Sequence, residues 1–164
     1  MKTIIAIDPG NNGGIAFGQV LSPQSGHAVS FAMPETDGDT LDLLKQRVLA
    51  DRLNGYETVV FLEHVGGYAG GAGSPGSAMF NFGMGFGFLK GVVMALGARL
   101  ELVRPQVWQK HFHLGTASAC ASKTEWKNKL KAEAQRRFPG IKITLATADA
   151  LLILDWARCQ EVVK

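Results

Sequence analysis

The order of hydrophobic periodicities along the chain predicts a mixed α/β layer fold. Three short apolar runs separated by turn residues open the sequence, and two further strand-like runs then alternate with segments of helical period. The composition agrees: 46% of the 164 residues are hydrophobic and 19% are charged, which allows a packed core and excludes a disordered chain. No repeat or linker divides the sequence, so we expect one domain over residues 1–164.

The first three strands should form an antiparallel meander. Apolar runs at Thr3–Ile7, Ile15–Val20 and His27–Met33 have extended character. Residues 8–14 (Asp-Pro-Gly-Asn-Asn-Gly-Gly) and residues 22–26 (Ser-Pro-Gln-Ser-Gly) are strong turn signals between them. Connections this short favour antiparallel neighbours.

The spacing of apolar residues from Thr40 to Leu53 predicts a helix. Asp39 or Thr40 is its expected N-cap, and Gly55 marks its C-terminal end. The expected apolar face comprises Leu41, Leu44, Val48 and Leu49. The next strand, Thr58–Leu62, is a continuous run rich in β-branched residues, which is typical of a strand buried on both faces.

The rest of the chain contains a glycine-rich loop at Gly66–Ser77, one strand at Arg99–Val103 and three helices. The expected helices are Met79–Leu96, Ser122–Phe138 and Thr147–Val162. The first is long enough to span a membrane and carries a row of small residues, Gly83, Gly87 and Gly91. Because Asn81 and Lys90 lie inside it, we expect no membrane span but a buried helix whose glycines let a neighbouring backbone approach closely.

Charge and cysteine content exclude several classes of protein. A net charge of +3 excludes a histone-like polycation but permits a locally basic face. Cys120 and Cys159 cannot form a disulfide framework, and no Cys/His cluster has zinc-ligand spacing. The apolar run at the N-terminus is too short for a secretory signal, so we expect reduced thiols and a cytoplasmic location.

Three acidic residues have positions that indicate a shared site. Asp8 and Glu63 end two buried strands, and both carboxylates emerge at one end of the sheet if those strands are neighbours. Asp149 lies in the first turn of the last helix, whose apolar face must pack on the sheet. Three converging carboxylates repel without a cation, and all-oxygen sites favour Mg²⁺ or Mn²⁺. The structural alternatives are a turn cap for Asp8, a surface position for Glu63 and a helix-dipole contact for Asp149.

The motifs around these acids resemble those of a known family. Residues 7–10 (Ile-Asp-Pro-Gly), 62–65 (Leu-Glu-His-Val), 103–108 (Val-Arg-Pro-Gln-Val-Trp) and 148–151 (Ala-Asp-Ala-Leu) are similar to RuvC-type Holliday-junction resolvases, short bacteriophage members above all. This family belongs to the RNase H-like superfamily, and the resemblance implies a mixed five-stranded sheet flanked by helices. Sugar kinases and actin-like ATPases also begin with Asp-x-Gly, but they need a second domain for which 164 residues leave no room.

The resemblance also implies a chemistry. Asp8, Glu63 and Asp149 would be catalytic metal ligands, holding two Mg²⁺ ions, for which Mn²⁺ substitutes. The chain departs from the pattern at Ala146, where cellular members carry a fourth metal-site residue, Asp or His. Alanine cannot bind a metal. The second metal site is then weak, another group completes it, or activity has been lost, naturally or by engineering.

A basic segment is the expected DNA contact. Between Lys123 and Arg137 six basic residues accompany two acidic ones, a local surplus larger than that of the whole chain. The alternative is a solvated helix face. By resemblance, Lys123 corresponds to a catalytic loop lysine and Tyr68 to an aromatic that stacks on an opened base. The residues expected to contact DNA are Tyr68, Lys110, Lys123, Lys127, Lys131 and Arg136.

The sequence therefore predicts, through this resemblance, a Mg²⁺-dependent endonuclease that resolves four-way junctions or other branched DNA by symmetric paired nicks. Paired cuts suit a homodimer, with Gly83, Gly87, Gly91 and Ala95 at its interface. Alternatively, these small residues pack inside one subunit. Two other functions stay open: a junction-binding protein without catalysis, and an RNase H-like nuclease acting on RNA–DNA hybrid or flap DNA.

Overall fold

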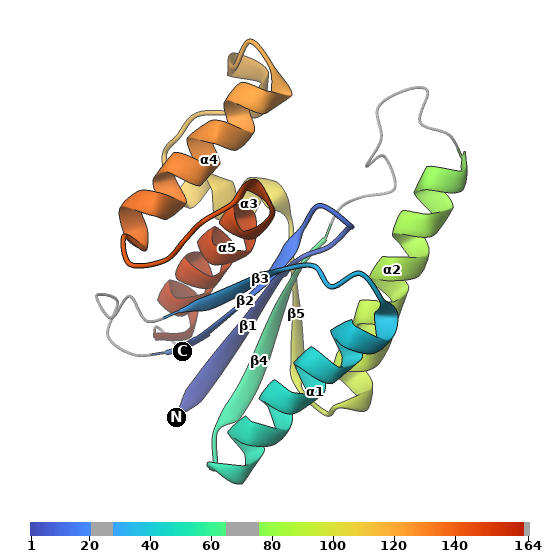
Figure 1. The fold of residues 1–164 in the computed structure, drawn as a ribbon. Coiled ribbons are helices and arrows are strands. Elements are labelled where there is room, and N and C mark those ends of the chain that lie inside the picture. The colour runs from blue at the N-terminus through green and yellow to red at the C-terminus, as the bar shows by residue number, and fades with distance from the viewer. Residues whose placement is uncertain (21–27, 65–75, 163–164) are drawn as a thin grey trace.

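The computed structural model describes residues 1–20, 28–64 and 76–162 and contains a five-stranded sheet with the order β3-β2-β1-β4-β5 (Figure 1). β1 pairs antiparallel with β2, and β2 pairs antiparallel with β3. β4 and β5 continue the sheet parallel to β1. The strands are β1 (Lys2–Asp8), β2 (Gly14–Gln19), β3 (Val29–Ala32), β4 (Glu57–Glu63) and β5 (Arg99–Val103). This confirms the predicted mixed sheet of three antiparallel strands followed by parallel ones.

Helices cover both faces of the sheet. Figure 1 shows α1 and α2 on one side and α3, α4 and α5 on the other. The helices are α1 (Asp37–Leu53), α2 (Gly76–Ala95), α3 (Pro105–His111), α4 (Lys123–Arg137) and α5 (Leu145–Val162), with a short 3-10 helix at Ala117–Ala119. Helix α3 was not predicted from the sequence. It has seven residues and begins with Pro105, too short a segment for a helical period to emerge.

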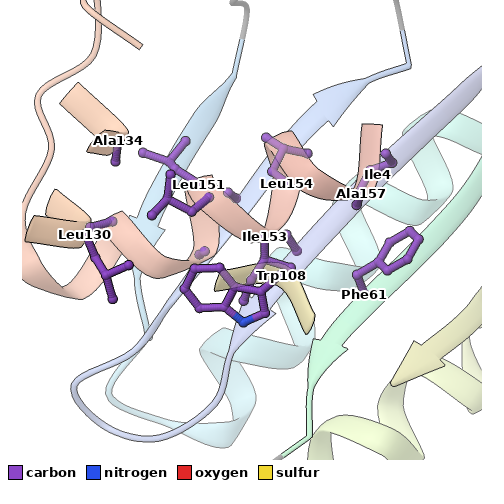
Figure 2. Close-up of a cluster of buried hydrophobic side chains, with 14 of the residues drawn as sticks. Ile4, Phe61, Trp108, Leu130, Ala134, Leu151, Ile153, Leu154 and Ala157 are labelled. Atoms are coloured by element: carbon purple, nitrogen blue, oxygen red, sulfur yellow. The ribbon is translucent and has the colours of Figure 1, made fainter. Parts of the chain in front are cut away.

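Side-chain alternation along the central strands divides the core into two halves. Ile4 and Ala6 on β1 and Phe61 on β4 belong to the half that packs against α5. Figure 2 shows Ile4 and Phe61 in one cluster with Trp108 and Leu151. The intervening residues of both strands pack against α1 and α2. Because β4 is buried on both faces, the expectation from its continuous apolar run is confirmed.

Helix α1 differs from its predicted apolar face and N-cap. Thr36 is the N-cap, since its side chain accepts a hydrogen bond from the backbone N–H of Asp39 at 3.1 Å. Leu41 and Leu49 are exposed. A buried polar contact attaches the end of α1 to the sheet. Asp51 accepts hydrogen bonds from the hydroxyls of Thr3 and Thr58 at 3.2 and 3.0 Å. Gly55, with φ +69°, follows the C-terminus as predicted.

Helix α2 contradicts the prediction of a buried helix. It buries Leu89, Val92 and Val93, while Phe80 and Met94 are 66% and 68% exposed. A Cβ on Gly83, Gly87 or Gly91 would meet nothing within 4 Å in the described chain, so no neighbouring backbone packs on this row. The helix is long and apolar enough to cross a membrane by length and composition, with 17% of its most apolar stretch buried.

Candidate active site

Asp8 and Glu63 lie side by side at the carboxyl ends of two parallel strands. In the register of β1 and β4, Ile7 is paired with Leu62, which brings the next residue of each strand to the same edge. Alternate side chains of a strand face the same side of the sheet. Asp8 therefore lies on the same face as Ile4 and Ala6, and Glu63 lies on the same face as Phe61. This is the face that α5 covers. They are 8% and 6% exposed.

The turn after β1 presses against Asp8 and the start of α5. A Cβ on Gly13 would stand 2.1 Å from the carbonyl oxygen of Asp8, and one on Gly14 would stand 2.5 Å from the carbonyl oxygen of Ala146. Only glycine permits backbones to approach this closely. Asp8 is paired with Gly14 across the hairpin, so the first turn of α5 is held beside the first carboxylate.

Asp149 completes the group from α5. The helix begins at Leu145, two residues before the predicted start, so Asp149 lies in its second turn and not in the first. This removes the alternative of a first-turn contact with the helix dipole. Asp149 is 3% exposed: its Oδ2 accepts a hydrogen bond from Nζ of Lys127 at 2.5 Å, and its Oδ1 has no hydrogen-bond partner among the described residues.

Trp108 of α3 holds Glu63 in place. The fully buried indole donates its Nε1–H to Oε1 of Glu63 at 2.9 Å. Figure 2 shows the indole inside the apolar cluster beneath α5, which restricts its rotation. No role at this site was predicted for Trp108 from the sequence. Its position at the end of the Val-Arg-Pro-Gln-Val-Trp motif was the available signal.

Burial and neighbouring negative charges raise the pKa values of Asp8 and Glu63. Burial, followed by the charges of Glu63 and Asp149, raises the pKa of Asp8 well above its usual range. Burial likewise raises the pKa of Glu63, although the hydrogen bond from Trp108 opposes that rise. For Lys127, burial lowers the pKa, but the charge of Asp149 and the hydrogen bond to it outweigh burial, and the pKa is raised. A cation at this position therefore stabilises the ionised carboxylates.

The donor chemistry fits a hard divalent cation. Three carboxylates supply oxygen ligands, and the unpartnered Oδ1 of Asp149 is a buried acceptor that such an ion would satisfy. In the described part of the chain, no three His, Cys, Asp or Glu side chains are gathered closely enough to hold an ion as they stand. Lys127 is the cation that Asp149 contacts. Ala146 adds no side-chain ligand.

Helix α4 supplies Lys127. Ser122 caps the helix by accepting from the N–H of Glu125, and Glu125 in turn accepts from the N–H of Ala121 at 2.8 Å. Lys127 lies three residues before the buried Leu130, a spacing that turns it toward α5. This spacing could have indicated that Lys127 faces the carboxylates rather than solvent.

Much of the predicted basic surplus is engaged within the chain. Arg136 and Arg137 both contact Glu133, and Arg137 also contacts Asp155 at 2.5 Å. Lys129 lies 3.5 Å from Glu125. The exposed Lys110 and Lys123 and the half-buried Lys131 have no ion pair with any residue that the structure describes. Lys123, at the first position of α4, makes no ion pair with the three carboxylates, and Tyr68 lies outside the described residues.

The sheet order and the helices that cover it define an RNase H-like fold of the RuvC type. Two structures of Thermus thermophilus RuvC are similar to the chain. One has 17% sequence identity and a TM-score of 0.57, covering 98% of this chain and 96% of that one. The other, in complex with a Holliday junction substrate, has 15% identity and a TM-score of 0.58, covering 99% and 96%. No family model and no curated protein matches the sequence.

Proposed function

We propose that the chain is a divalent-metal-dependent endonuclease that cuts four-way junctions or other branched DNA. The convergence of Asp8, Glu63 and Asp149, from β1, β4 and α5, at one edge of a RuvC-like sheet carries this proposal. Burial and neighbouring carboxylate charges raise the pKa of both Asp8 and Glu63, and buried acids perturbed in this way are typical of catalytic sites. The RuvC structure in complex with a Holliday junction supports the choice of substrate.

The three carboxylates would hold Mg²⁺ or Mn²⁺. When bound, the metal supplies Lewis-acid chemistry, lowering the pKa of a water and stabilising the charge on the phosphate and the leaving 3′-oxygen. The chain itself positions these ligands. Trp108 fixes the rotamer of Glu63, and the Gly13 turn holds Asp8. The ammonium of Lys127 contributes positive charge where the phosphate becomes more negative.

Basic side chains of α3 and α4 would bind the DNA backbone. Lys110, Lys123 and Lys131 are the predicted phosphate contacts that lack an ion pair with any described residue, and each phosphate neutralised adds to the salt dependence of binding. Arg136 is paired with Glu133 and would have to exchange that carboxylate for a phosphate. Tyr68 is proposed to stack on an unpaired base at the junction, a contact worth about 1–3 kcal/mol.

A homodimer would place two such sites on the two strands that must be nicked. The exposed apolar side of α2, with Phe80, Met84 and Met94, and its row of open glycines suit contact with a second copy. The membrane-spanning alternative rests on the composition of the same helix. We retain a cytoplasmic homodimer as the proposal, to be checked by the mass of the protein in solution without detergent.

A junction-binding protein without catalysis is the second candidate. It is favoured by Ala146, which supplies no ligand, and by the ion pair that already engages Asp149. Such a protein would bind junctions as well in chelator as in Mg²⁺, because phosphate contacts do not need the carboxylates.

The proposal is tested with a labelled four-way junction, incubated with the protein in Mg²⁺ or Mn²⁺ and analysed on a denaturing gel. Asp8→Asn protein, linear duplex and an RNA–DNA hybrid are the controls. Symmetric nicks in the junction alone, absent with Asp8→Asn, are expected. Binding without nicks would establish the junction binder, and preferential cleavage of the hybrid would identify an RNase H-like nuclease of another specificity.

A further inference from the structure

We propose that the Lys127 ammonium is a fixed cation of the carboxylate site, standing in for one of two metal ions, so that each chain binds a single divalent ion. This inference rests on the proposed function, because it assigns the cation content of the same site. It concerns the place of Lys127 at Asp149, whereas the sequence predicted that Lys127 contacts DNA.

Lys127 is built into the site. Its Nζ lies 2.5 Å from Oδ2 of Asp149, and its charge also acts on Asp8 and Glu63. The backbone of α4 cannot easily withdraw, since Trp126, Leu130 and Ala134 pack in the same buried cluster as α5. About one third of the Lys127 side chain is exposed, so the side chain as a whole is partly shielded from water.

The two oxygens of Asp149 have different environments. Oδ2 accepts from Lys127, whereas Oδ1 is buried with no hydrogen-bond partner in the described chain. A buried carboxylate oxygen without a partner is costly. Asp149 would therefore hold Lys127 through one oxygen while its other oxygen stays available as a ligand for a metal ion.

The net charge of the site and the number of its ligand side chains both fit the binding of a single divalent ion. Three carboxylates and one ammonium leave two negative charges, which one divalent cation neutralises. A second ion would need a further ligand, and Ala146, whose carbonyl lies beside Gly14 and so beside Asp8, carries no donor side chain. Ala146 removes a ligand that a second metal ion would need, and Lys127 supplies the positive charge that this second ion would have brought.

The test measures Mn²⁺ binding without DNA, by isothermal titration and by electron paramagnetic resonance of free Mn²⁺. The wild-type protein should bind one ion per chain. Lys127→Gln should bind Mn²⁺ at least tenfold more tightly or bind two ions, because three carboxylates are left without their internal cation. Lys127→Arg, which keeps the charge, should bind one ion within about threefold of wild-type affinity. Lys129→Gln is the matched control on the same helix, away from the site, and should behave as wild type.

Two ions per wild-type chain would overturn the inference. So would a Lys127→Gln protein that is folded by circular dichroism but has the affinity and stoichiometry of Lys129→Gln. Failure of the proposed function is recognised separately. Wild-type protein that binds one Mn²⁺ with the expected lysine dependence, yet leaves every branched DNA uncut, would refute the nuclease and support the charge assignment.

Discussion

Replacing Asp8 by asparagine should stabilise the protein in the absence of divalent ions, although it should abolish cleavage. Burial raises the pKa of Asp8 in the folded chain. Protonation of Asp8 therefore stabilises the fold: this contribution is complete below the pKa of the unfolded chain and is lost as pH rises through the folded pKa. The asparagine side chain of the variant carries no charge at any pH, and its amide can still donate to Glu63. The Asp8→Asn protein should gain stability over wild type as pH rises and lose that advantage in acid.

The magnitude follows from the burial of Asp8 and from Lys127. Exchanging buried ions for neutral groups of similar volume stabilises proteins by about 1–4 kcal/mol. Lys127 already compensates part of the negative charge, so the lower half of that range, about 1–2 kcal/mol, is expected. For a chain of 164 residues this corresponds to an increase in Tm of about 2–8 °C.

Thermal unfolding at neutral pH, in EDTA and in Mg²⁺, measures this effect. In EDTA the Asp8→Asn protein should melt above wild type. In Mg²⁺ at about one hundred times Kd, binding should stabilise wild type by about 2.7 kcal/mol and reverse the order. Asp42→Asn, at an exposed aspartate of α1, should change neither value. An Asp8→Asn protein that melts below wild type in EDTA would refute the account of the carboxylate repulsion.

Three further substitutions test the surroundings of the site. Trp108→Phe removes the hydrogen bond that lowers the pKa of Glu63, so the pH midpoint of Mn²⁺ binding should rise; an unchanged midpoint would dismiss this role. Gly13→Ala places a Cβ 2.1 Å from the carbonyl of Asp8 and should cost about 1–3 kcal/mol in urea unfolding and weaken Mn²⁺ binding, whereas normal binding would show that the turn is not a constraint. Lys131→Gln should reduce the salt slope of junction binding by about one, and an unaltered slope would remove Lys131 from the interface.

Local sequence signals were sufficient to predict the strands of the sheet and the positions of the three acids at its edge. The β-branched run before Glu63 and the turn residues after Asp8 specify where β4 and β1 end, and the parity of side chains then directs both carboxylates to the face that α5 covers. Asp149 was placed correctly on that helix, though two residues too near its start.

Tertiary packing decided what the sequence did not predict. The contact of Lys127 with Asp149 depends on how α4 docks on α5, which charge counting along one helix does not specify. The glycine row of α2 indicates close packing, but composition does not tell whether the partner is in the same chain. The structure shows no such partner in the described chain, which contradicts the buried helix and leaves the homodimer as a proposal.

A supercoiled plasmid that extrudes a cruciform tests the central claim most directly, because one such plasmid offers the protein a single four-way junction. In Mg²⁺ the wild-type protein should convert the plasmid to linear product, the signature of paired nicks across the junction, and Asp8→Asn should leave it supercoiled while still binding it. Plasmid that stays supercoiled with wild-type protein bound would contradict the assignment of a nuclease.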